Sequence, residues 1–223
     1  MNIEKSTFQF LKDLKKNNNR DWFNENKSVF KQHEALTKSF FKSVKDGLNL
    51  TDKIESHKVW RIYRDVRFSK DKTPYKSRFA GSFTRQGAER RGGYYLNIEP
   101  GNAIVGGGFY GPNKEDLLRI RKEFEQSDKA IRKILDNADF KTYFPNGLEG
   151  EELKSAPRGF DKEHKSIDLI RKKQFIVLRR FSDSDVIQPG FEDEVLKTYK
   201  VIRTYFDFMS DVLTTDLNGE SIL

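Results

Sequence analysis

Cysteine is absent from this chain of 223 residues, which excludes disulfide bonds, thiolate metal sites and a cysteine nucleophile. Histidine occurs three times, and His33, His57 and His164 stand in different segments without the spacing of a metal site. No window approaches the roughly 18 apolar residues that a membrane-spanning helix needs. The first ten residues, MNIEKSTFQF, contain no apolar run of the kind found in signal peptides. We therefore expect a cytoplasmic protein without a membrane partner.

Common catalytic motifs are also missing. The chain has neither a Walker phosphate loop nor the G-x-S-x-G motif of hydrolases, and no pair of carboxylates is spaced in a way that specifies hydrolysis. The sequence consequently names no reaction and no cofactor.

Aromatic residues are plentiful. Nineteen Phe and eight Tyr supply bulky core material in a chain that is 35% hydrophobic and 34% charged. This length fits one domain spanning residues 1–223, and no repeat or low-complexity tract indicates a second. We expect the core to hold the fold without disulfides or metals.

The expected fold begins with helices. Ser6 or Thr7 is placed to cap a short helix that ends at the three Asn residues 17–19. Apolar residues then recur at helical spacing over residues 21–48, which predicts one long amphipathic helix.

Strands are expected from residue 58 onward, where the hydrophobic period changes to two. The expected strands span residues 58–63, 77–84, 94–100, 102–110 and 174–181. Short links between the first four favour an antiparallel sheet. Helices are expected after Pro112, at 130–135 and at 191–213, and a long irregular segment at 139–165. The prediction is an α+β fold, an antiparallel sheet with helices packed mainly on one side.

The segment 61–76, RIYRDVRFSKDKTPYK, carries six basic and two acidic residues, and so half of the formal net charge of +8. Arginine offers a permanently charged fork that binds carboxylate or phosphate oxygens bidentately. If Trp60 and Ile62 face the core, Arg61 and Tyr63 point the other way, and a loop or hairpin follows around Pro74. We expect an anion site here. The alternative is an internal salt-bridge network in which Asp65, Asp71 and Glu99 absorb the arginines.

Glycines and a second basic loop complete the expected site. The run 106–111, GGGFYG, matches a dinucleotide-binding pattern, but the segments after it do not continue such a fold. Gly107 and Gly108 either allow close strand packing or offer N–H groups to an anion. Arg158 lies in a rigid loop that is a candidate lid. The expected ligand-binding residues are Arg61, Arg64, Asp65, Arg67, Lys70, Asp71, Lys72, Tyr75, Lys76, Gly107, Gly108 and Arg158.

Two weak catalytic candidates accompany this set. His164 is placed to exchange protons near neutral pH if the loop before it closes over a pocket, although pairing at a helix start is the simpler interpretation. Asp65 is the other candidate. The run SDSD at 182–185 either binds Mg²⁺ or, more commonly, forms a turn that caps the next segment.

The pattern R-x-x-R-D-x-R-F-x-x-D-K-x-x-Y that begins at Arg61 resembles the signature of the DUF2461 family, also called TIGR02453, which consists of bacterial proteins of about this length. NNNRDWFNENK from residue 17, GGYYLNIEP from 92, VGGGFYGP from 105 and LKSAPRGFDKEH from 153 resemble the same family. The resemblance covers nearly the whole chain and implies no catalytic role.

The leading functional hypothesis is that the cluster binds a phosphorylated or other anionic small molecule. A nucleic-acid partner is the alternative, and it requires an open basic ridge that continues into Arg85, Arg90 and Arg91, with exposed aromatic rings for stacking. A structural or interaction protein is the third possibility and requires neither. Asp65 and Asp71 favour the first hypothesis, because acids would repel a polyphosphate track but can orient arginines in a pocket.

Overall fold

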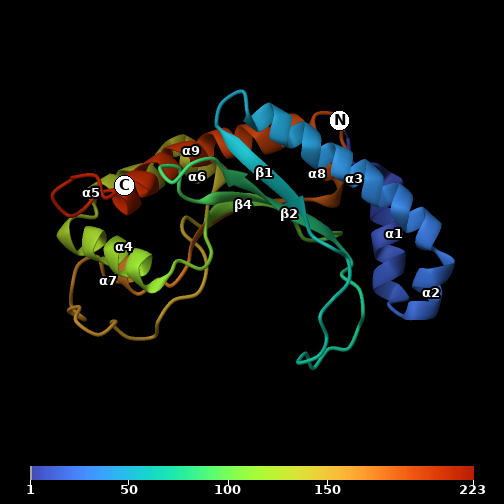
Figure 1. Cartoon of the computed structure of the whole chain (residues 1–223), viewed down its shortest axis with the longest axis horizontal. Coiled ribbons are helices and arrows are strands. Elements are labelled where there is room, and N and C mark those ends of the chain that lie inside the picture. The colour runs from blue at the N-terminus through green and yellow to red at the C-terminus, as the bar shows by residue number, and fades with distance from the viewer. Residues whose placement is uncertain (1) are drawn as a thin grey trace. The chain divides into compact units, whose positions relative to one another are not determined.

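A computed structural model describes residues 2–223 of the chain and has an α+β fold (Figure 1). Its five strands form one antiparallel sheet in the order β1-β2-β3-β4-β5. The strands are β1 (Ile54–Val59), β2 (Phe79–Arg85), β3 (Gly93–Ile98), β4 (Ala103–Phe109) and β5 (Phe175–Phe181). Helices pack against the sheet, so the expected fold class is confirmed.

The chain divides into two compact units, each built from three segments. Unit 1 comprises residues 2–83, 95–105 and 180–197, and unit 2 comprises residues 84–94, 106–179 and 198–223. The strands β2 to β5 and the helix α9 (Phe191–Thr214) contribute residues to both units.

Unit 1 contains three N-terminal helices, α1 (Lys5–Lys16), α2 (Arg20–Glu25) and α3 (Lys27–Leu48), together with the short α8 (Asp183–Val186). Helix α3 packs on the sheet through Phe41, whose ring lies 5.6 Å from that of Phe83 and nearly parallel to it. Both rings are fully buried. The apolar stripe that predicted this helix therefore faces the core.

The single helix expected over residues 21–48 is wrong, because Asn26 interrupts it. The Asn26 backbone has φ −99° and ψ 13°, and its side-chain amide donates 2.8 Å to the Trp22 carbonyl. An Asn side chain competes in this way for backbone carbonyls and ends a helix even where the apolar period continues. Ser6 and Thr7 also do not cap α1. Both lie inside it, and the Thr7 hydroxyl is buried 3.1 Å from Nδ1 of His33.

The first strand lies earlier in the chain than expected, at Ile54–Val59. It is the edge strand of the sheet and mostly polar, with only Ile54 buried. Polar edge strands lack the alternation that reveals half-buried ones. Beyond it, Trp60 N still donates 2.8 Å to the Ala80 carbonyl.

Unit 2 contains α4 (Lys114–Gln126), α5 (Lys129–Leu135), α6 (Ala138–Tyr143) and α7 (Ile167–Ile170). Asn113 caps α4, since its side chain accepts 2.7 Å from the Asp116 N–H. Apart from α6, the segment 139–165 is irregular, as the Gly and Pro residues predicted. Lone bridges from Glu149 to Ile176 and from Glu152 to Lys172 fasten it.

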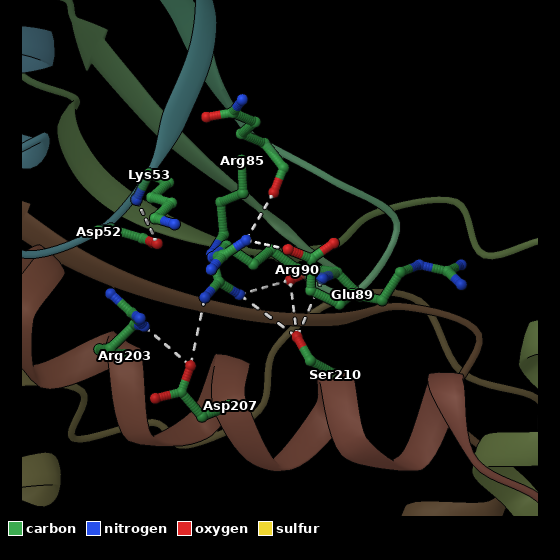
Figure 2. A network of polar contacts seen from close by, with 10 residues as sticks. Asp52, Lys53, Arg85, Glu89, Arg90, Arg203, Asp207 and Ser210 are labelled. Carbon is green, nitrogen blue, oxygen red and sulfur yellow. Dashed lines mark hydrogen bonds and ion pairs between the residues drawn. The ribbon is translucent and has the colours of Figure 1, made fainter. Parts of the chain in front are cut away.

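A buried arginine ties β2 to α9 within unit 2 (Figure 2). The Arg85 side chain is 1% exposed, pairs with Asp207 at 3.2 Å and also donates to the Arg91 carbonyl at 2.9 Å and to Ser210 at 3.3 Å. A buried guanidinium needs such a set of acceptors because its charge cannot be left without partners.

None of the helices within residues 2–223 combines the length and apolarity needed to cross a bilayer.

Candidate anion-binding site

The basic cluster lies on a hairpin-like loop between β1 and β2, in unit 1. In Figure 1 this loop runs away from the ends of the two strands. A bridge between Tyr63 and Tyr75 closes it, with Arg64 N donating 2.9 Å to the Pro74 carbonyl and Lys76 N donating 2.8 Å to the Ile62 carbonyl. Ile62 is buried and Arg61 is exposed, as the alternation predicted.

The base of the loop is fastened to the N-terminal helices. The Asn18 side chain accepts 3.1 Å from the Tyr75 N–H and donates 2.9 Å to the Tyr75 carbonyl. The Tyr75 ring is buried and stacks on Phe23, with 3.9 Å between the ring centres. Asn18 thus holds both polar backbone groups of Tyr75, and the buried ring holds its side chain. The neighbouring residues of the loop therefore extend from a rigid base.

A pocket of about 390 Å³ lies beside this fastened base. Four basic and two acidic side chains line it, so its lining carries a positive excess. The lining residues are Lys15, Asn18, Arg64, Asp71, Thr73, Tyr75, Lys76, Ser77, Arg78 and Glu99.

Arg64 is held in the pocket by a single nitrogen. Its Nη1 donates to the Asp71 carboxylate and to the Thr73 hydroxyl, and the side chain is 25% exposed. Its Nε and Nη2 groups have no protein acceptor among residues 2–223. A guanidinium carries five N–H donors, so an oriented set remains for a ligand.

Asp71 is itself locked in place. Its carboxylate accepts 2.9 Å from the Thr73 N–H and 2.8 Å from the Thr73 hydroxyl, in addition to the Arg64 pair. The Thr73 backbone N–H and the hydrogen bonds from Arg64 and Thr73 together lower the pKa of Asp71 to about 2. The carboxylate is therefore ionised at neutral pH and serves to orient Arg64.

Lys76 contributes a second cation to the lining. Its Nζ donates 3.1 Å to the Arg61 carbonyl. Burial lowers the pKa of Lys76, and the positive charges of Arg78, Arg61 and Arg64 lower it further. Arg78 lies 3.8 Å from Glu99, a loose pair, and Glu99 also accepts 3.0 Å from Asn102.

The outer part of the loop is exposed and does not line this pocket. Asp65 and Arg67 form a bidentate pair at 3.0 and 2.7 Å, with the Arg67 side chain 77% exposed. The hydrogen bonds from the Arg67 side chain lower the pKa of Asp65, which leaves it ionised and a poor proton donor. Lys72 Nζ donates 2.9 Å to the Val66 carbonyl. Phe68 is 97% exposed.

Both acids of the cluster thus pair with one arginine each, as the salt-bridge alternative expected. Neither pair neutralises the remaining bases. Within residues 2–223, Arg61, Lys70, Lys72 and Lys76 have no carboxylate within ion-pair distance.

Gly107, Gly108 and the loop that carries Arg158 lie in unit 2. A Cβ on Gly107 would lie 2.7 Å from the Gly93 carbonyl oxygen, and one on Gly108 would lie 2.2 Å from that of Phe175. Gly108 also has φ +139°, a conformation that strongly favours glycine. These contacts fit the interpretation that the glycines permit close strand approach. Arg158 is exposed on the irregular loop.

His164 and the SDSD run make local structural contacts. His164 Nδ1 accepts 3.1 Å from the N–H of Ser166, the N-cap residue of α7, so its ring takes part in the turn that precedes this helix. Ser182 forms a capping box with Asp185 at the start of α8. Asp183 accepts 2.6 Å from Gly101 N and pairs with Lys12 at 3.0 Å. Residues 2–223 contain no group of three or more His, Asp or Glu arranged to hold a metal ion.

The expected site left out six of the ten residues that line the pocket. They are Lys15, Asn18, Thr73, Ser77, Arg78 and Glu99, and of these Glu99 was expected only as a salt-bridge partner of the arginines. Lys15 lies in the last turn of α1 and Asn18 follows that helix, both more than forty residues before the cluster. Their position beside the loop depends on tertiary structure, so no local sequence pattern predicts it. Arg78 had a signal, since it directly continues the basic run.

Comparisons with known proteins identify a family and no individual relative. Neither the curated proteins nor the solved structures yield a match to this chain. Residues 6–208 match a family described as conserved hypothetical protein (DUF2461). Because that match covers nearly the whole chain, the chain belongs to the DUF2461 family.

Proposed function

We propose that the pocket beside Tyr75 binds a small phosphorylated or polycarboxylate molecule. The observation that carries the proposal is the geometry of Arg64. Asp71 and Thr73 hold it through Nη1, and its other N–H groups have no acceptor within residues 2–223. An arginine oriented before binding loses little side-chain entropy when a ligand arrives.

The surroundings of Arg64 support the same conclusion. Lys15, Lys76 and Arg78 add three more cations to the lining, against the carboxylates of Asp71 and Glu99. A volume of about 390 Å³ falls within the range of small-molecule sites. A ligand with several negative oxygens would meet the Arg64 fork and the neighbouring cations together.

Thermal denaturation tests this proposal. Phosphate, pyrophosphate or citrate should raise the melting temperature above that in chloride of the same ionic strength. A ligand at about a hundred times its dissociation constant adds roughly 2.7 kcal/mol to the free energy of unfolding, an increase of several degrees for a chain of this size.

Arg64→Lys should abolish most of this rise, because the charge stays but the fork is lost. Arg67→Lys is the matched control, since Arg67 lies on the same loop, pairs with Asp65 and does not line the pocket. Equal responses of the two variants would contradict the proposal, as would the absence of any anion effect on the unchanged protein.

Nucleic-acid binding is a second candidate, favoured by the exposure of Phe68 among basic neighbours. A ring that is 97% exposed beside Arg67, Lys70 and Lys72 resembles a stacking platform on a cationic surface. The ridge does not extend to Arg85, whose side chain is buried. Arg90 and Arg91 pair with Glu89 and Asp116.

Fluorescence anisotropy with labelled single-stranded oligonucleotides tests this candidate. Phe68→Ala should cost about 1–3 kcal/mol of binding free energy through lost stacking, and affinity should fall steeply with salt. Tyr110→Ala, at another exposed aromatic residue, is the control and should bind unchanged. Loss of binding in both variants, or in neither, would reject a specific role for Phe68.

A further inference from the structure

Lys76 differs from Lys70 and Lys72 of the same loop in being half-buried and in lining the pocket. Two lysines line the pocket, and of these Lys15 is exposed whereas Lys76 is half-buried. The Lys76 amine donates to a backbone carbonyl, that of Arg61, at 3.1 Å. No carboxylate among residues 2–223 lies within ion-pair distance of it.

This environment favours the neutral amine. A carboxylate partner would stabilise the ammonium form, whereas a carbonyl contact leaves it weakly stabilised. Burial is the main cause of the lowered pKa of Lys76, and three neighbouring guanidinium groups add to it. A neutral lysine amine is a nucleophile towards carbonyl carbon, and desolvation beside other cations is a known way to activate one.

We propose that the Lys76 amine forms an imine with an aldehyde or ketone that carries a carboxylate or a phosphate. The inference rests on the proposed function, because Arg64 and Arg78 are the groups that would hold the anionic end of this compound. It deepens that function by naming the substrate class and the reacting atom.

The step balances without any co-reactant. The Lys76 ammonium first releases a proton to solvent, and the nitrogen lone pair then attacks the carbonyl carbon to give a carbinolamine. The carbinolamine oxygen takes up a proton and leaves as water while the C=N bond forms. In total, the ammonium and the carbonyl compound give a protonated imine and one water, with the charge unchanged.

Reductive trapping tests the inference on the full-length chain. The protein is incubated separately with pyruvate and with dihydroxyacetone phosphate, reduced with cyanoborohydride, digested and mapped by mass spectrometry. The expected product is a secondary amine at Lys76, heavier by the mass of the carbonyl compound less one oxygen. Lys70 and Lys72, exposed on the same loop, serve as internal references.

Labelling at Lys76 should exceed that at Lys70 by at least about tenfold at neutral pH, because only there is the carbonyl held beside the amine. Arg64→Gln should lower the labelling of Lys76 at least about tenfold, the effect of losing a charge-assisted hydrogen bond. Acetone, which lacks an anionic group, should give no such preference.

Lys76→Arg removes the reacting amine and should show no adduct at residue 76. The phosphate response of the unchanged protein separates the inference from the proposed function. Stabilisation of the unchanged protein by phosphate, with labelling spread evenly over its lysines, would overturn the imine and leave the anion site standing. Absence of both stabilisation and selective labelling would overturn both.

Discussion

At the scale of single residues, two arginines with similar sequence neighbours acquire opposite roles. Arg67 is turned outward and bound bidentately by Asp65, whereas Arg64 is turned into the pocket and held through one nitrogen by Asp71 and Thr73. The charge excess was predictable from the sequence. Which of the two arginines faces the pocket was not predictable. The strand alternation ends after Arg64, where the backbone leaves the pairing around the Tyr63–Tyr75 bridge.

Asp71→Asn should lower the melting temperature at neutral pH and also weaken the phosphate response, because Arg64 loses its orienting partner. The pKa of Asp71 falls from 3.8 to about 2 on folding. Its contribution to stability is therefore fully present above about pH 4 and is lost as the pH falls towards 2. Melting curves of the two proteins should converge over that range.

Asp65→Asn is the control for this experiment. The Asp65–Arg67 pair is exposed, and such pairs contribute little to stability. We expect the phosphate response of this variant to match that of the unchanged protein. A loss as large as that in Asp71→Asn would show that the response reflects net loop charge rather than the orientation of Arg64.

At the scale of elements, the loop depends on its fastening to the end of α1. Asn18→Ala removes both hydrogen bonds to the Tyr75 backbone and leaves its N–H and carbonyl groups without their partner. We expect a loss of about 1–3 kcal/mol in the free energy of unfolding, measured by urea titration. Asn24→Ala, on the exposed face of α2, should stay within about 0.5 kcal/mol.

The elements that the sequence predicted best are those with a continuous buried stripe. Helix α9 was expected over residues 191–213 and is found at Phe191–Thr214, and β4 lies inside the expected 102–110. Prediction failed where a local polar contact competed with the pattern. Asn26 divides α2 from α3, and the edge position of β1 removes its alternation.

The glycines of β4 give a second prediction at this scale. Gly108→Ala should destabilise the protein by about 2 kcal/mol or more, because its Cβ would lie 2.2 Å from the Phe175 carbonyl oxygen and its φ is +139°. Gly111→Ala is the matched control and should leave the urea midpoint nearly unchanged, because within residues 2–223 no atom beyond its chain neighbours lies within 4 Å of the added Cβ. A mild effect at Gly108 would reject close strand packing as the reason for this glycine.

At the scale of the whole molecule, the two units are interleaved along the chain. Each consists of three segments, and β2 to β5 and α9 contribute residues to both. No single cut of the chain releases either unit intact. Whether residues 1–223 form one domain, as expected, therefore depends on whether the two units unfold together. The sequence could not predict this, because cooperative unfolding depends on contacts that form only on folding.

If the chain is one cooperative domain, a destabilising substitution in the core of unit 2 should also lower the unfolding midpoint of unit 1. Trp22 and Trp60, the two tryptophans of the chain, both lie in unit 1 and report its unfolding by fluorescence. Phe124 is fully buried in α4 of unit 2, so Phe124→Ala should cost about 3–5 kcal/mol and lower the fluorescence midpoint in urea. Leu118→Ala, on the exposed side of the same helix, should leave it unchanged. A fluorescence midpoint that stays fixed in Phe124→Ala while the circular dichroism transition splits would show two units that unfold independently, because a two-state chain loses all its structure in one transition.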